Sequence, residues 1–262
     1  MLPKPEHLAP EYGAQFKDRS IVEAYQYRPP YPAEVFDILN DLITEQPRHV
    51  LDIGAGIGYI ARYLVNRVDR LDAVDFSLNM IEHGKSLPNG NNPHLHWLYG
   101  RVEDVALTPP YALITAGESL HWMDWDTVLP RFREVLTPNG YLAIIEHDPR
   151  PTPWYAELAE IIPKFSTNTK YQPYDLIDEL EMRGLFQKVG EKETRPVPFL
   201  QSVDDYIASF HSRNGFSRDR MKPEMATAFD QEAKKILLEK YPDGVMSLQV
   251  VGNVIWGIPK KP

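Results

Sequence analysis

The sequence has no cysteine among its 262 residues. Disulfide bonds, thiolate nucleophiles and cysteine-ligated zinc or iron–sulfur centres are therefore excluded. No apolar run approaches the ~20 residues that a membrane-spanning helix needs, and residues 1–5 lack the apolar stretch of a secretory signal. We therefore expect a cytoplasmic protein that has no membrane partner.

Positive charge is also scarce. The chain has 28 lysines and arginines against 37 acidic residues, a formal net charge of −9. With this excess of acidic residues we expect no basic patch that could bind a phosphate backbone, so nucleic acid is not expected as a partner. His94 and His96 alternate on a predicted strand without a carboxylate at ligand spacing, and no metal site is expected.

Residues 46–148 alternate short β-branched runs with helical patterns, which is typical of a parallel sheet with crossover helices. Here the sequence predicts strands at 49–54, 71–76, 95–100, 111–117 and 141–148, and helices near 58–67, 77–86 and 125–136, the last ended by a turn at 138–140. A sixth strand ending near Phe199 and a last strand at about 246–257 complete the sheet. The predicted fold class is α/β, a doubly wound, Rossmann-like sheet of seven mostly parallel strands.

Helical patterns flank this predicted core on both sides. Residues 1–45 form a proline-punctuated N-terminal arm that leads into a helix over 35–43. Residues 149–262 complete the sheet and add helices at about 151–172 and 202–241, which we expect to form a cap inserted into the sheet topology. No repeat or linker interrupts the chain, so the sequence predicts a single domain over residues 1–262.

Three alternating glycines, Gly54, Gly56 and Gly58, follow the first predicted strand and precede a helix. Glycine permits a tight turn and a close approach of ligand to backbone, and the helix N-terminus presents free N–H groups. Asp75, at the end of the second strand, can accept both hydroxyls of a ribose. Together these features indicate a nucleotide cofactor. Tyr59 stands where the dinucleotide fingerprint needs its third glycine, which disfavours NAD and its relatives.

These motifs resemble those of the class I methyltransferases that use S-adenosyl-L-methionine (SAM). The resemblance implies SAM as the cofactor and a direct, in-line methyl transfer as the activity. It also implies that Met80 touches the adenine and that Glu103 and Asp104 lie near the adenine amino group. The cofactor-binding residues implied by the four matching motifs are Asp52, Gly54, Ala55, Gly56, Gly58, Asp75, Phe76, Ser77, Met80, Val102, Glu103, Asp104, Ala116, Gly117 and Trp122.

Two further segments, Tyr27–Pro32 (YRPPYP) and Glu118–Met123 (ESLHWM), resemble the small-molecule branch that includes trans-aconitate methyltransferase. This resemblance implies a small-molecule acceptor and an Arg28 that helps to hold the methionyl carboxylate, for which a guanidinium fork is well shaped. A surface ion pair is the alternative for Arg28. A catalytically silent, SAM-binding regulatory subunit is the alternative for the whole protein, and either a monomer or a homodimer fits the sequence.

The ligand crevice of such a sheet lies beyond the carboxyl ends of its strands, between the first and fourth. His121 is the best placed base or positioning group there, unless its role is structural, and His147 competes with it. The predicted acceptor contacts are Glu118 and, from the cap, Trp154, Tyr206, Phe210, His211 and Arg213. Alternatively, the cap aromatics hold the cap together and residues 211–214 form a solvated turn.

Overall fold

The central sheet of the computed structural model, which describes residues 4–260, has the strand order β3-β2-β1-β4-β5-β8-β6, with β7 paired to β8. The first five strands are parallel. Strand β8 pairs in antiparallel fashion with β5, β6 and β7. The strands are β1 (His49–Ile53), β2 (Arg70–Asp75), β3 (Leu95–Tyr99), β4 (Tyr111–Gly117), β5 (Leu136–Arg150), β6 (Phe186–Glu193), β7 (Val197–Ser202) and β8 (Val245–Pro259). Residues 1–3, part of the stretch considered for a secretory signal, and residues 261–262 lie outside the described residues.

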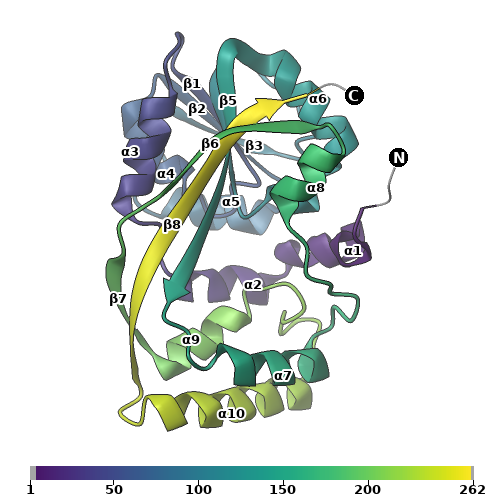
Figure 1. Ribbon diagram of the computed structural model, residues 1–262, viewed down its shortest axis with the longest axis vertical. Coiled ribbons are helices and arrows are strands. Elements are labelled where there is room, and N and C mark those ends of the chain that lie inside the picture. Colours follow the sequence, from purple (N-terminus) through teal and green to yellow (C-terminus); the bar gives the residue numbers. More distant parts are fainter. Residues whose placement is uncertain (1–3, 261–262) are drawn as a thin grey trace.

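Helices cover both faces of the sheet, because the central strands are apolar on both sides (Figure 1). On one face, α3 (Ala33–Leu42) and α4 (Ala61–Leu64) share a core with β1 and β2. On the other face, α6 (Trp125–Val135) and α8 (Leu176–Met182) pack on β1, β4 and β5. This arrangement confirms the predicted doubly wound α/β fold. Helix α5 (Leu78–Ser86) follows β2, and the 3-10 helices η4 (Val65–Arg67) and η5 (Leu120–Trp122) complete the elements of this part.

The cap lies at one end of the sheet, where β5, β7 and β8 extend beyond the other strands (Figure 1). It consists of α7 (Tyr155–Phe165), α9 (Val203–Phe210) and α10 (Pro223–Lys240). These helices enclose an apolar core of their own. Helices α9 and α10 stand between β7 and β8 in the chain, which is where the sequence places an inserted helical segment.

Two strand predictions differ from the structure. The segment expected as one strand ending near Phe199 forms both β6 and β7, so the sheet has eight strands among the described residues rather than seven. Pro196, in the break between them, has no N–H with which to continue a ladder. The predicted turn at 138–140 belongs instead to the first part of β5, where the pairing with β4 shifts register after Leu136.

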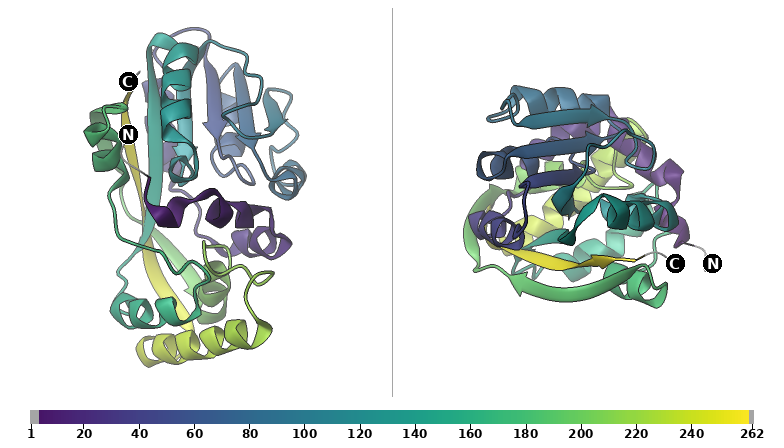
Figure 2. Two further views of the ribbon diagram at one scale, coloured as in Figure 1. Left: turned by 90° about the vertical axis from the view of Figure 1, so that its right-hand side faces the viewer. Right: turned by 90° about the horizontal axis from the view of Figure 1, so that it is seen from above.

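The N-terminal segment crosses between the sheet and the cap (Figure 2). Its elements are η1 (Glu6–Leu8), α1 (Pro10–Gly13), η2 (Ala14–Lys17), α2 (Arg19–Ala24) and η3 (Tyr25–Tyr27). The carboxylate of Asp18 accepts hydrogen bonds from Ser217 Oγ at 2.7 Å and from Arg220 Nε at 2.6 Å. The segment is therefore attached to the loop between α9 and α10. No helix of the described chain combines the length and the apolar character needed to cross a membrane.

Candidate cofactor and acceptor site

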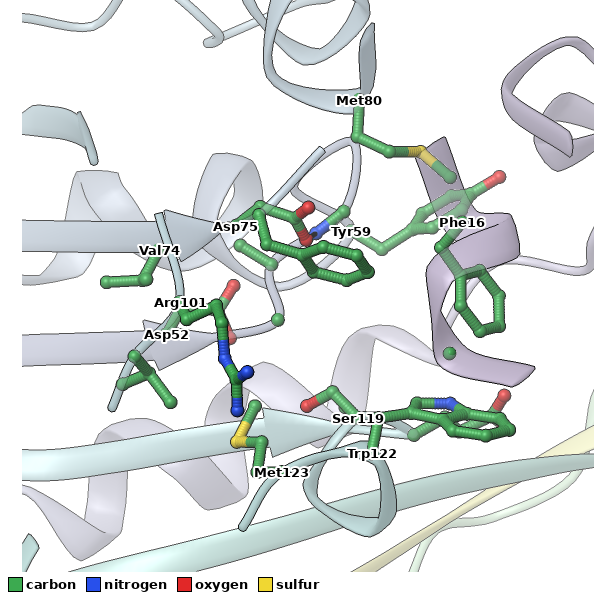
Figure 3. Close-up of a pocket in the computed structure, with 18 of the residues that line it drawn as sticks. Phe16, Asp52, Tyr59, Val74, Asp75, Met80, Arg101, Ser119, Trp122 and Met123 are labelled. Carbon is green, nitrogen blue, oxygen red and sulfur yellow. Dashed lines mark hydrogen bonds between the residues drawn. The ribbon is translucent and has the colours of Figure 1, made fainter. Parts of the chain in front are cut away.

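A cavity of about 280 Å³ lies beyond the carboxyl ends of β1, β2 and β4 (Figure 3). Its floor is the glycine loop that follows β1. Its far wall comes from the N-terminal segment, where the Phe16 ring lies 5.5 Å from the Trp122 ring, centroid to centroid. The cavity is thus enclosed by elements from three distant parts of the sequence.

The glycine loop is shaped by backbone conformation and by crowding. Gly54 and Gly56 have φ values of +61° and +56°, a region that side chains disfavour. A Cβ on Gly54 would lie 2.5 Å from Ser119 Cβ, whereas a Cβ on Gly56 would meet only a Tyr25 ring atom at 3.8 Å. The sheet packing therefore requires Gly54, while Gly56 leaves bare backbone open to the cavity.

Two buried carboxylates support this loop. Asp52 accepts hydrogen bonds from Thr115 Oγ1 at 2.8 Å and from the amide of Ala61 at 3.2 Å. Asp75 accepts from the amides of Gly56 and Ser77, each at 2.7 Å. Burial raises the pKa of Asp52 to about 7 and that of Asp75 to about 6, although the hydrogen bonds act in the opposite direction. Asp75 lies at the rim of the cavity, where a ribose hydroxyl can reach it.

The wall beyond Asp75 is largely apolar and suits a flat heterocycle. Phe76, Met80 and Val102 line it. Glu103 lines it too, but its carboxylate is already engaged, since Oε1 accepts hydrogen bonds from the amide of Asp124 at 3.0 Å and from Arg101 at 3.1 Å. An adenine amino group would therefore share Glu103 with these two donors.

Most of the residues predicted to bind the cofactor meet in this cavity: Arg28, Asp52, Gly54, Ala55, Gly56, Asp75, Phe76, Met80, Val102, Glu103, Gly117 and Trp122. Glu118 and His147 line it as well. Four predicted residues, Gly58, Ser77, Asp104 and Ala116, do not line it. Ser77 instead caps α5 by accepting from the amide of Met80, and Ala116 is buried within β4.

Arg28 is part of the cavity wall. Its Nε and a terminal nitrogen donate to Oγ and O of Ser212, both at 2.7 Å. The other terminal nitrogen lies 3.5 Å from Glu118 Oε2, and the guanidinium stacks on Tyr25 at 4.3 Å from the ring centroid. The side chain is only 17% exposed, which argues against the surface ion pair and leaves a positive charge facing the cavity.

A second cavity of about 200 Å³ adjoins the first and shares Glu118, Ser119 and His147 with it. Nδ1 of His147 lies 2.9 Å from Oε1 of Glu118. Glu118 has a φ of +48°, a strained conformation for a residue with a side chain. Burial raises the pKa of Glu118, but His147 and Arg28 outweigh this effect and hold it at about 2.

His121 lines only the second cavity. Burial lowers its pKa to about 4, and Glu118 only partly opposes this effect. The ring is therefore neutral at physiological pH. Of the two predicted histidines, only His147 faces both cavities.

The cap side chains that were predicted to contact the acceptor lie outside both of these cavities. Trp154, Tyr206, Phe210, His211 and Arg213 line neither cavity. Trp154 Nε1 donates to the Tyr206 hydroxyl at 3.0 Å, and the Arg213 guanidinium lies 4.1 Å from the Phe210 ring centroid. His211 is held within hydrogen-bond distance of Asp230 and of the Phe216 carbonyl. The aromatic residues hold the cap together, as the alternative interpretation had it. The solvated turn that this alternative predicted at 211–214 differs from the structure, because His211 and Ser212 are buried.

The N-terminal segment takes the place that was expected for the cap. The residues of this segment that sequence reasoning missed all line the first cavity: Pro10, Gly13, Ala14, Phe16, Lys17, Tyr25 and Tyr31. Tyr31 belongs to the YRPPYP segment and Tyr25 lies just before it, so this motif could have indicated both tyrosines. The residues before it form short turns without a hydrophobic period and carried none.

Comparison with known proteins assigns the family. Residues 50–140 match the model of a methyltransferase domain family. Malonyl-[acyl-carrier protein] O-methyltransferase of Halalkalibacterium halodurans is 30% identical over 209 residues, which are 75% of this chain and 76% of that protein. The chain belongs to the SAM-dependent methyltransferases. This finding confirms the predicted family and its cofactor, SAM.

Other members of the family match over shorter lengths. An uncharacterized methyltransferase of Mycobacterium tuberculosis is 33% identical over 147 residues, 55% of this chain and only 57% of that methyltransferase. Trans-aconitate 2-methyltransferase of Pseudomonas aeruginosa is 29% identical over 124 residues, 46% of this chain and 44% of that enzyme. A solved structure from Anaeromyxobacter dehalogenans, described as a type II methyltransferase, covers 89% of this chain and 99% of its own at 19% identity and a TM-score of 0.63, which confirms the fold.

The residues present fit SAM. Gly56 leaves backbone open to the cavity, Asp75 places a buried carboxylate at its rim, and Phe76 and Met80 supply apolar surface. Arg28 contributes a positive charge to the wall of the cavity.

Proposed function

We propose that this methyltransferase moves the methyl group of SAM to a small-molecule acceptor by direct in-line displacement. The observation that carries the proposal is that the two cavities share Glu118, Ser119 and His147 in their walls. A cofactor held in the first cavity would meet, at these residues, a second space of about 200 Å³. Such a space suits a small acceptor better than a protein surface.

When bound, SAM supplies an electrophilic methyl group on a good leaving group. The protein then contributes position and exclusion of water, and alignment of two reactants can supply roughly 7–11 kcal/mol of barrier reduction. Asp75 would hold the ribose, Phe76 and Met80 the adenine, and Arg28 the carboxylate. Phe16 and Trp122 would keep water away from that side of the cofactor.

The names of two relatives support an acceptor that is a small molecule or a small acyl group carried on a protein. One is named for trans-aconitate and the other for a malonyl group on acyl-carrier protein. In the acceptor cavity of this chain, His121 would position the substrate, because its lowered pKa makes it a weak base.

Two measurements test the proposal. In calorimetry, S-adenosylhomocysteine should bind, whereas NAD and ATP should release no heat. Transfer of a labelled methyl group from SAM to a panel of small amines, acids and phenols should then produce at least one methylated product, and Asp75→Ala should reduce that transfer. Binding without transfer to any acceptor would favour a catalytically silent, SAM-binding regulatory subunit. A lack of binding would overturn both readings.

A further inference from the structure

The second cavity is lined by acidic groups and by no lysine or arginine. Its lining residues are Glu118, Ser119, Leu120, His121, Ile144, Glu146, His147, Asp148 and Leu176. Glu146 and Asp148 are exposed, whereas Ser119, Leu120 and Ile144 are buried. At neutral pH the neutral ring of His121 does not offset the carboxylates. A ligand in this cavity therefore meets negative charge.

Lys4 acts electrostatically on His121, but it donates to the Met123 carbonyl at 2.9 Å and does not line the second cavity. The two arginines near the cavity are already paired. Arg28 reaches Glu118 from the first cavity, but its two shortest hydrogen bonds go to Ser212. Arg150 lies 3.2 Å from Glu193 and 4.0 Å from Asp148, at an exposed position where water screens the interaction. Neither arginine lines the second cavity, so neither is placed to receive an acceptor carboxylate there.

His147 gives an independent indication of a ligand. Its side chain is 8% exposed and lines both cavities. Nδ1 lies 2.9 Å from Glu118 Oε1, so the carboxylate orients the ring between the two cavities. A ligand that lies where the two cavities meet would contact this ring, which can accept a proton.

We infer that the acceptor is a small amine, methylated on nitrogen, that gives up a proton to His147. This inference rests on the proposed function. The ammonium form would be attracted by Glu118, Glu146 and Asp148. Transfer of its proton to His147 frees the nitrogen lone pair and creates an imidazolium beside the Glu118 carboxylate.

The reaction balances without a further reactant. The nitrogen lone pair forms a bond to the methyl carbon, and the carbon–sulfur bond breaks with its electron pair on sulfur. The products are the methylated amine and S-adenosylhomocysteine, and the proton held by His147 returns to solvent. A carboxylate acceptor needs no base and would be repelled by the three carboxylates, so this cavity disfavours the acidic acceptors for which the relatives are named.

The test is a matched acceptor panel with the full chain and SAM carrying a labelled methyl group. Each small primary or secondary amine is paired with the carboxylic acid of the same carbon skeleton, and mass spectrometry assigns the methylated atom. We expect N-methyl products and a kcat/KM at least about 100-fold higher than for the matched acid, since like charges in a partly buried site repel strongly. Methyl esters of the acids, or no product from any amine while S-adenosylhomocysteine binds, would overturn the inference and leave SAM binding intact. Failure of S-adenosylhomocysteine to bind would overturn the proposed function as well.

Three variants distinguish the attraction of the amine by negative charge from the role of His147 as a base. His147→Gln should lower kcat for the amine about 100-fold or more, and lower it far more than it weakens binding of S-adenosylhomocysteine. Glu146→Gln should raise KM for the amine by about twofold to fivefold, the effect of an exposed ion pair. Glu160→Gln, an exposed carboxylate on α7 outside both cavities, is the matched control and should change neither constant. An unchanged kcat in His147→Gln would contradict the assignment of the base.

Discussion

The backbone amide of Gly56 donates a hydrogen bond to the carboxylate of Asp75 at 2.7 Å. The acid at the end of β2 and the glycine loop after β1 are therefore one structural unit. Each carboxylate oxygen has a second lone pair, so Asp75 can hold the loop and still accept from a ribose. Loss of this side chain should affect both the loop and the cofactor.

Asp75→Ala should weaken binding of S-adenosylhomocysteine by roughly 1.5–3 kcal/mol, the range for hydrogen bonds to a charged group. Calorimetry at neutral pH measures this change. Asp41→Ala, an exposed carboxylate on α3, serves as the control and should bind normally. An unchanged affinity in Asp75→Ala would show that the ribose is held elsewhere.

Cofactor affinity should fall as the pH drops from 7 to 5. The pKa of Asp75 is raised by burial to about 6, so the group takes up a proton in this window and one of its oxygens becomes a donor. A protonated Asp75 cannot accept from two amides and a ribose as the carboxylate does. Affinities measured across this range should fall for the natural chain and change less for Asp75→Asn. If affinity fell equally with pH in both proteins, another group would be responsible for the pH dependence. Asp52 would be the first candidate, because its pKa is raised to about 7.

Arg28→Lys keeps the positive charge but cannot reproduce the two hydrogen bonds to Ser212. We expect about a tenfold loss of affinity for S-adenosylhomocysteine, on the order of 1.4 kcal/mol, together with a lower melting temperature. Arg19→Lys, in an exposed pair with Glu23, is the control. A lower melting temperature with unchanged affinity would restrict Arg28 to anchoring the N-terminal segment.

Asp18→Asn should speed the release of S-adenosylhomocysteine. Asp18 holds the N-terminal segment to Ser217 and Arg220, and that segment covers the cofactor cavity. A loss of ~1–2 kcal/mol from these contacts corresponds to a dissociation rate about 5- to 30-fold higher. Stopped-flow displacement measures it. Glu23→Gln, on the exposed side of the same segment, should leave the rate unchanged.

Gly56→Ala and Gly244→Ala form a matched pair. Both glycines have positive φ, +56° and +74°, so alanine costs roughly 1–2 kcal/mol of stability at either position. A methyl group on Gly56 would project into the cofactor cavity, while Gly244 has open space around it. Only Gly56→Ala should lose affinity for S-adenosylhomocysteine. Equal affinities in the two variants would contradict the placement of the cofactor over this loop.

The sequence was most informative where function depends on local structure. The glycine loop, its helix and Asp75 follow one another along the chain, and the physical demands on a tight turn are visible in the residues themselves. Glu118 could be named because it opens the ESLHWM segment after one predicted strand, and His147 because it lies at the end of another. Their contact at 2.9 Å could not be predicted, since it depends on the pairing of β4 with β5 and on the unusual backbone of Glu118.

The sequence predicted that the cap would enclose the cavity, whereas in the structure the N-terminal segment does so. The difference has a physical reason. Aromatic residues such as Trp154 and Phe210 bury apolar area equally well in a core or around a ligand, so composition does not distinguish the two. The segment that does close the cavity folds as short helical turns whose positions are set by long-range contacts, such as that of Gln15 with the Gly215 amide. Periodicity along the sequence contains no information about such contacts.

The contacts that hold the N-terminal segment also set an order of events in biosynthesis. Arg28 bonds to a residue 184 positions later in the chain, and Asp18 to one 202 positions later. Strands β1 to β5 can leave the ribosome and pair long before residues 212–220 are made, so a nascent chain would have its glycine loop but no closed pocket. Because the cover over that loop forms only after the cap loop has emerged, tight retention of the cofactor should report that residues 212–220 have been made and have docked.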